Sequence, residues 1–127
     1  MFTHITVGAN DVEASRQFYD AALGALGIPA AQGPDPRGRF WWRTERGAFG
    51  VGKPLDGEPA CHANGGTLGF HAKTPEMVEA FHAAGVAAGG APIEDPPGER
   101  KGPFGTLVLA YLRDPSGNKI CAVHRPK

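Results

Sequence analysis

Hydrophobic and polar positions in the first part of the chain predict a strand followed by an amphipathic helix. The segment 2–7, Phe-Thr-His-Ile-Thr-Val, is typical of a short strand. Asn10, with Glu13 three residues on, resembles a capping box, so the helix is expected to begin near Asn10 and Asp11. Small and apolar residues then recur every three or four positions, as one buried helix face requires: these are Val12, Ser15, Phe18, Ala22 and Leu26.

The same pattern returns in the second half of the chain. A shift of 63 residues aligns 67–70 with 4–7 and, without a gap, places Phe81 under Phe18. A second helix is predicted from Thr74, because the proline that follows it suits the first helical position. This weak internal repeat predicts two copies of one structural module.

Short strands joined by tight turns are predicted after each helix. The candidates are 39–44, 48–52, 106–112 and 119–123, with further short candidates at 30–32 and 91–94. Between the last two long candidates, Asp-Pro-Ser-Gly-Asn at 114–118 has strong turn chemistry. The segment 95–103 is rich in proline, glycine and charge, and is predicted to be a mobile loop.

Strand, helix and two or three strands, repeated once, is an α+β order. We expect two repeated βαβββ modules that form a cupped, half-barrel mixed sheet, with the helices outside and a cleft inside. The two modules, at about 1–60 and 66–127, are expected to make one domain, with a linker between them.

Composition narrows the class of protein. The chain has 127 residues, of which 41% are hydrophobic and 20% charged, as in a globular protein. Its formal net charge is +0 with no block of like charge, so neither nucleic acid nor an anionic membrane is an expected partner. We see no secretory signal and expect both cysteines to be free thiols, which makes the cytoplasm the expected location.

Four short segments in this order resemble one known superfamily. They are His-x-x-Val at 4–7, Asp-Val-Glu-x-Ser-x-x-Phe-Tyr at 11–19, Leu-Gly at 23–24 and Asp-Pro-Ser-Gly-Asn-x-Ile at 114–120. Together with the repeat, they resemble the vicinal oxygen chelate superfamily, which holds glyoxalase I, ring-cleaving dioxygenases and bleomycin- and fosfomycin-resistance proteins. The resemblance covers nearly the whole chain and implies the fold more strongly than a particular chemistry.

The resemblance also implies four metal-ligand positions on strands in the cleft. They fall on His4, near Gly50, on Thr67 and on Cys121, and only His4 is a ligand of the usual type. We therefore expect a degenerate site, with His4 and Cys121 as the metal candidates and a divalent ion (Zn, Ni or Fe) or none as the cofactor. As a ligand, Cys121 would favour a soft or borderline ion; inert packing is the alternative.

Other side chains are candidates for contact with a substrate. Thr67 and His71 share one face of a strand by their spacing, and Tyr111 is a polar anchor on another. Trp41 and Trp42 point to opposite faces, so one is expected to line the cleft and the other to pack elsewhere. Further polar candidates are Arg43 and Arg113, because arginine suits carboxylate capture; placement on the rim is the alternative for both. No residue is assigned as catalytic.

Two functions from different classes follow from these features. The first is a glyoxalase-like lyase or isomerase that acts on a small carbonyl compound, with a metal that polarises substrate oxygens. The second is a metal-free protein that binds a drug or metabolite, as in the bleomycin-resistance type, through apolar burial and a few polar anchors. In either case the partner is a small molecule, and the resemblance implies a homodimer.

Overall fold

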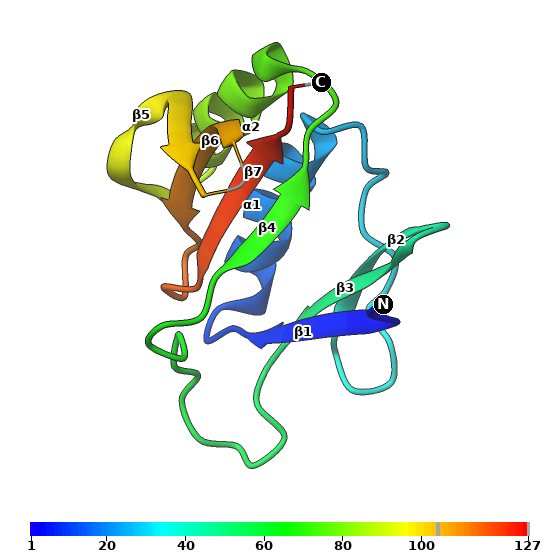
Figure 1. Cartoon of the computed structure of the whole chain (residues 1–127). Coiled ribbons are helices and arrows are strands. Elements are labelled where there is room, and N and C mark those ends of the chain that lie inside the picture. The colour runs from blue at the N-terminus through cyan, green and yellow to red at the C-terminus, as the bar shows by residue number, and fades with distance from the viewer. Residues whose placement is uncertain (104, 127) are drawn as a thin grey trace.

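A computed structural model describes residues 1–103 and 105–126 of the chain. Its elements, in chain order, are β1 (His4–Gly8), α1 (Val12–Gly24), β2 (Phe40–Thr44), β3 (Gly47–Gly52), β4 (Leu68–His71), α2 (Pro75–Ala87), β5 (Ala91–Gly102), β6 (Gly105–Arg113) and β7 (Lys119–His124). Figure 1 shows the two helices together behind the strands, with β1 to β3 in its lower part and β4 to β7 above them.

The strands form two sheets that repeat one topology. Within the described ranges, the first sheet has the order β1-β3-β2 and the second sheet has the order β4-β7-β6-β5. In each sheet the strand before the helix runs parallel to the last strand of its half, β1 with β3 and β4 with β7. The expected α+β fold is therefore confirmed, as a cupped and not a closed arrangement.

Both predicted helices are present, and they obey the repeat. Each has 13 residues, and α2 begins 63 positions after α1. In α2 the Thr74 side chain caps the backbone N–H of Met77, and a proline occupies the first turn as predicted. No helix in 1–103 or 105–126 is long and apolar enough to cross a membrane.

The predicted cap of α1 is corrected by one residue. Asp11, not Asn10, accepts the hydrogen bond from the backbone N–H of Ala14, at 2.9 Å. The Asn10 side chain instead accepts from the backbone N–H of Ala60, at 2.8 Å. Its oxygen thus secures the segment that leads into the second half of the chain.

Aromatic rings fill the core between α1 and the first sheet and continue toward the second. Tyr19 lies 5.5 Å from Trp42 and 4.8 Å from Phe49, measured between ring centroids. Phe49 in turn meets Phe70 of β4 edge to face, at 5.3 Å. Such contacts add to the free energy of burying the rings, so one continuous core stabilises both halves.

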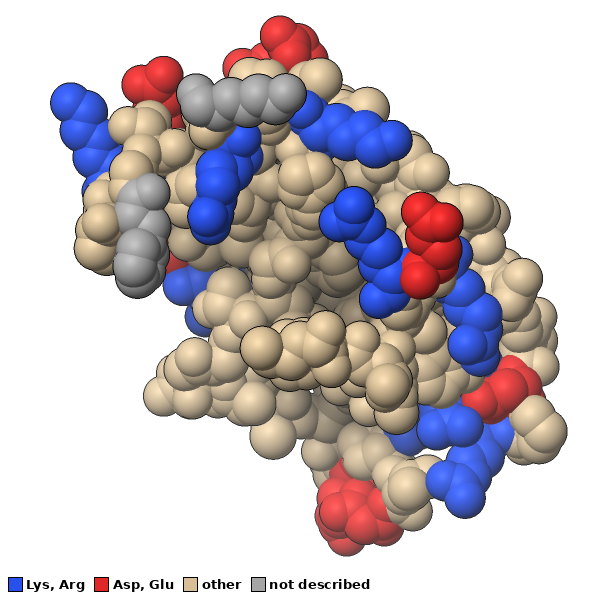
Figure 2. All heavy atoms as spheres, turned by 45° about the vertical axis from the view of Figure 1, so that its right-hand side comes forward, with Lys and Arg blue, Asp and Glu red and all other residues tan. Residues whose placement is uncertain are grey.

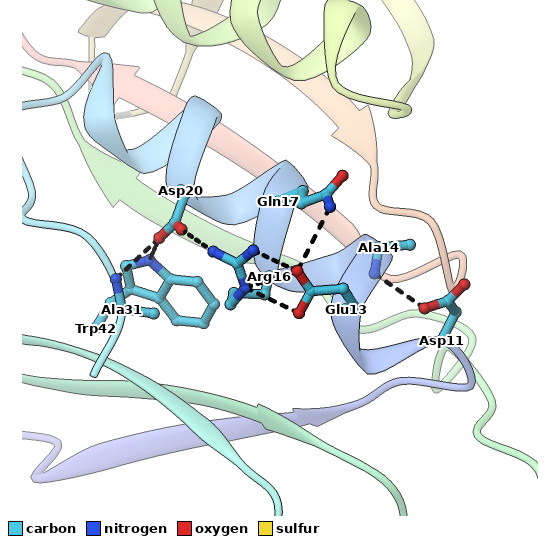
Figure 3. Close-up of polar contacts among 8 residues, drawn as sticks. All are labelled: Asp11, Glu13, Ala14, Arg16, Gln17, Asp20, Ala31 and Trp42. Carbon is cyan, nitrogen blue, oxygen red and sulfur yellow. Dashed lines mark hydrogen bonds and ion pairs between the residues drawn. The ribbon is translucent and has the colours of Figure 1, made fainter. Parts of the chain in front are cut away.

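Polar side chains of α1 hold the chain that leads into β2, as Figure 3 shows. Asp20 accepts hydrogen bonds from the Trp42 indole at 3.0 Å and from the backbone N–H of Ala31 at 2.8 Å. Arg16 pairs with Asp20 at 2.7 Å and also with Glu13, one turn earlier. These contacts satisfy the buried indole N–H and fix which face of β2 turns toward the helix.

The turn at 114–118 fastens the two halves to each other. The Asp114 carboxylate accepts a hydrogen bond from the hydroxyl of Tyr19 at 2.6 Å, and the Asn118 amide donates one to the carbonyl of Gly8 at 2.9 Å. Asp114 and Asn118 are themselves buried. The turn residues on which the resemblance rests therefore have a structural role, because buried polar groups need such partners.

Two strand predictions need correction. The segment 95–103 was expected to be a loop, but β5 extends through it to Gly102 and pairs with β6. A register shift between Ile93 and Gly98 accommodates the prolines, which cannot donate to a ladder. In the first half, the strand expected at 30–32 is reduced to one isolated bridge between Gln32 and Trp41.

Candidate functional site

The first sheet has one face covered by the core and one that is open. Trp42 and Phe49 point to the core, so their neighbours along β2 and β3 point the other way. Directly paired residues share a face. The central strand, β3, contributes only alanine and glycine to the open face. The side chains of this open face lie in two rows across β2, β3 and β1: Arg43, Ala48 and His4, then Trp41, Gly50 and Thr6.

The Trp41 indole lies over Gly50. A Cβ atom at Gly50 would sit only 2.6 Å from ring atom Cζ3 of Trp41, closer than real Cβ contacts allow. The imidazole of His4 meets the same indole edge on, with 6.1 Å between ring centroids. The position near Gly50, where the resemblance places a metal ligand, therefore has neither a donor atom nor room for one.

A carboxylate fixes this indole in place. The Asp35 carboxylate accepts hydrogen bonds from the Trp41 indole N–H at 2.9 Å and from the Arg39 guanidinium at 2.8 Å. The hydrogen bond from Trp41 is the main reason that the pKa of Asp35 lies well below its usual range, with further bonds from Arg39 and Arg37. Asp35 is thus a permanent anion that restrains both side chains.

Two guanidinium groups accompany the indole. The Cζ atom of Arg39 lies 5.1 Å from the Trp41 ring centroid, and that of Arg43 lies 5.3 Å from it. Both distances are within the range of cation–π attraction, which is strongest for tryptophan. The first sheet therefore presents an aromatic ring held by one carboxylate and two cations.

The second sheet has an equivalent but differently filled face. Tyr111 pairs with Cys121, which in turn pairs with Gly69 across the parallel strands. Lys119 lies 4.9 Å from the Tyr111 ring centroid and forms an ion pair with Glu94. Burial is the main cause that raises the pKa of Tyr111, so its hydroxyl is a hydrogen-bond donor at neutral pH.

The donor set does not fit the metal site that the resemblance implies. Cys121 is only 4% exposed, and burial raises the pKa of its thiol from 9.0 to about 11. A metal ligand must be the thiolate, which this burial disfavours. Among the residues that the structure describes, no three His, Cys, Asp or Glu side chains are grouped to hold a metal ion.

A hollow continues the open face beyond Trp41. It has a volume of about 370 Å³ and lies beside Arg39, between the ends of β1 and β3 and the segment 53–61. Its lining includes Thr6, Gly8, Gly52, Lys53 and Cys61. Figure 2 shows Lys and Arg side chains spread over the face in view, which is hollowed near its centre.

The structure places the predicted site residues on both sheets. His4 meets Trp41 on the first sheet, whereas Tyr111 meets Cys121 on the second. The inclusion of Trp42 is corrected, because its ring is 2% exposed and packs in the core. The two tryptophans do point to opposite faces, as their alternation predicts.

Thr67 and His71 lie at the two ends of β4. Thr67 is exposed and precedes the strand, which begins at Leu68. His71 is the last residue of β4 and is also exposed, opposite Val123. Neither is grouped with other possible metal ligands in the described ranges.

Sequence reasoning missed Asp35 and Arg39. A usable signal was present, because Arg39, Trp41 and Arg43 alternate along one strand and so share a face. Nothing in the sequence indicates that Asp35 folds back onto this strand. Arg113, considered beside Arg43, instead donates to the carbonyl of Gly117 at 2.8 Å and so supports the turn.

The fold and this site define a protein of the glyoxalase type. The family model "Glyoxalase/Bleomycin resistance protein/Dioxygenase superfamily" matches residues 1–122, and the chain belongs to this superfamily. No curated protein matches the sequence.

Solved structures resemble the chain over nearly its whole length. A glyoxalase/bleomycin resistance protein from Albidiferax ferrireducens T118 is 55% identical, with a TM-score of 0.95 over 98% of this chain and 99% of that one. A glyoxalase-related enzyme from Fulvimarina pelagi is 20% identical, with a TM-score of 0.75 over 99% and 88%. A lactoylglutathione lyase from Agrobacterium tumefaciens is 18% identical, with a TM-score of 0.67 over 98% and 92%. The latter two likenesses concern the fold alone.

Proposed function

We propose that the protein binds a small organic molecule on the open face of the first sheet without using a metal. The carrying observation is the Trp41 indole, which lies over Gly50 where the family's metal site would need a ligand. An aromatic wall with a few fixed polar groups is typical of small-molecule sites. We infer that the two modules act as one binding domain, because the aromatic core continues from Phe49 to Phe70.

The degenerate donor set supports binding without metal. His4 is a competent ligand, but Gly50 has no donor atom and Cys121 is a buried thiol with a raised pKa. Two of the implied ligand positions thus oppose a metal for different physical reasons, one steric and one electrostatic. Aromatic burial and charged anchors are then left to provide affinity.

The proposal is tested by screening small molecules for thermal stabilisation of the wild-type chain and of Trp41→Ala. A molecule that binds the open face should raise the Tm of the wild type, quench its tryptophan fluorescence and lose most of its effect on Trp41→Ala. The matched control is Tyr111→Ala on the second sheet, which should keep the effect. Binding that survives Trp41→Ala but is lost in Tyr111→Ala would place the ligand on the second sheet and contradict the proposal.

Metal analysis provides the complementary test. Protein purified without chelator is expected to carry no stoichiometric Zn, Ni or Fe, and addition of these ions should leave its Tm unchanged. A stoichiometric metal that disappears in the variant His4→Ala, Cys121→Ser would contradict metal-free binding.

A glyoxalase-like lyase or isomerase remains the second candidate, and the position of His4 favours it. The imidazole is exposed on the same open face, and within residues 1–103 and 105–126 only its Nδ1 is engaged, by the hydroxyl of Thr3 at 2.9 Å. A free ring nitrogen beside a bound carbonyl compound can move a proton. Solvent deuterium incorporated into a bound ligand by the wild type, and not by His4→Ala, would support this candidate.

Homodimer formation is also proposed. Strands β1 and β4 each form an edge of their sheet, so their outer backbone groups can pair with another chain. Light scattering coupled to size exclusion should give twice the monomer mass of 13.3 kDa.

A further inference from the structure

The charges on the open face of the first sheet do not cancel. Asp35 forms an ion pair with Arg39 and accepts the Trp41 indole N–H, so one carboxylate is balanced by one guanidinium. Arg43 has no such partner: no Asp or Glu of the described residues forms an ion pair with it. One positive charge is therefore left on this face.

The unbalanced guanidinium lies beside the Trp41 ring on the exposed surface of β2. Arg43 lies 5.3 Å from the Trp41 ring centroid, and Asp35 prevents that ring from turning away. A restrained arginine loses less conformational entropy when it binds a ligand than a free surface arginine does. The backbone beneath it is also fixed, because β2 pairs with β3 throughout its length.

The neighbouring positions leave space for a ligand beside this charge. Across the sheet from Arg43 stands Ala48 and then His4, so a small residue separates the two nitrogen-bearing side chains. Gly50 follows in the next row, where the Trp41 indole covers it. A flat group can approach the surface at Ala48 without meeting a long side chain from β3, while an arginine fork and an imidazole flank it.

From this geometry we infer the chemical class of the ligand: a flat apolar body that carries a carboxylate, with Arg43 as the group that selects the carboxylate. The inference rests on the proposed binding function and makes it specific. A guanidinium presents two parallel N–H donors that match the two oxygens of a carboxylate. Trp41 supplies apolar surface for the body, and Arg39 positions Trp41 through Asp35 without contacting the ligand.

Two pairs of probes test this inference, benzoate with benzamide and 2-naphthoate with 2-naphthamide. Each pair keeps the flat body and changes only the charge. Titrations followed by tryptophan fluorescence and calorimetry should show each acid binding at least about tenfold more tightly than its amide. In Arg43→Gln, the ratio of the two affinities should fall to near one, while the affinity for the amide changes little.

Two further variants separate a specific role of Arg43 from a general effect of charge. Arg46→Gln removes the same charge from the exposed turn between β2 and β3, and should keep the ratio of acid to amide affinity. Arg43→Lys keeps the charge but not the planar fork, and should keep only part of the ratio. An equal fall in Arg46→Gln and Arg43→Gln would overturn the role assigned to Arg43.

The remaining outcomes distinguish the two proposals. Equal affinities of acid and amide for the wild type would overturn the carboxylate inference and leave small-molecule binding standing. Failure of all four probes to bind at millimolar concentration, together with no stabilising molecule in the wider screen, would overturn both.

Discussion

The two sheets carry an aromatic residue at equivalent positions, but the charged groups beside it come from different elements. In the first sheet Trp41 pairs with Gly50, and in the second Tyr111 pairs with Cys121. Each ring has a cation beside it, and a carboxylate neutralises a cation in both cases, Asp35 in the first and Glu94 in the second. The repeat therefore extends beyond the backbone to the aromatic residue, whereas the neighbouring cation and anion arise separately in each half.

The difference between the sheets lies in size and in charge. The Trp41 ring lies over Gly50, whereas the smaller Tyr111 ring lies beside Cys121, which is buried and has a side chain where Gly50 has none. Lys119 in the second sheet is paired, but the first sheet has Arg43 in addition to the paired Arg39. The cation beside the ring of the second sheet is thus paired with a carboxylate, whereas the first sheet keeps an additional guanidinium that we propose contacts a ligand.

The largest expected effect is on the free energy of unfolding, which an alanine should lower at Gly50 but hardly change at Gly69 in the second sheet. Gly50→Ala should lower the free energy of unfolding by about 2 kcal/mol, because its Cβ would overlap the Trp41 ring. Gly69→Ala should change it by less than about 0.5 kcal/mol, since its Cβ would meet Cys121 and Val123 at an ordinary 3.4 Å. Urea unfolding measures both values.

The same experiment has an internal check. In a Trp41→Ala background, Gly50→Ala should cost less than about 0.5 kcal/mol, because the overlapping ring is gone. An undiminished cost in that background would show that the glycine is needed for another reason.

A smaller effect is expected from the buried thiol of the second sheet. Its pKa is raised from 9.0 in the unfolded chain to about 11 in the folded one, so folding disfavours the thiolate. The stabilisation of the neutral thiol is complete below pH 9, and stability is lost as the pH rises toward 11. Relative to Cys121→Ala, the wild type should lose about 1 kcal/mol by pH 10. A pH-independent difference between the two would contradict the burial effect.

The smallest effect concerns the paired cation of the second sheet. Lys119→Gln should lower the free energy of unfolding by only about 0.5 kcal/mol, because partly exposed ion pairs contribute little. It should also leave the ratio of acid to amide affinity unchanged, in contrast to Arg43→Gln. A fall of that ratio in Lys119→Gln would remove the proposed distinction between the two sheets.

Much of the fold could be predicted because its signals are local. Both helices, their spacing of 63 residues and the Thr74 cap follow from periodicity and capping chemistry. The strand through 95–103 could not, since proline and glycine argue for a loop unless a bulge and a partner strand are known. The cap of α1 was misplaced because Asn10 and Asp11 both have capping side chains, and the contact with Ala60 decides between them.

The candidate site was predicted less completely. Alternation placed Trp41 and Trp42 on opposite faces, but it could not tell which of them is buried. The answer depends on Asp20, which lies 22 positions earlier in the chain and accepts the Trp42 indole N–H.

The sequence by itself determined the repeat, the α+β order and membership of the glyoxalase superfamily, because periodicity, caps and turns act over a few neighbouring residues. The tertiary structure decided that the Trp41 indole lies over Gly50, that Asp35 neutralises Arg39 and that Arg43 pairs with no carboxylate of the described residues. These properties depend on contacts between strands and on a loop that folds back onto them. Local patterns along a chain do not record which side chains will meet across a sheet.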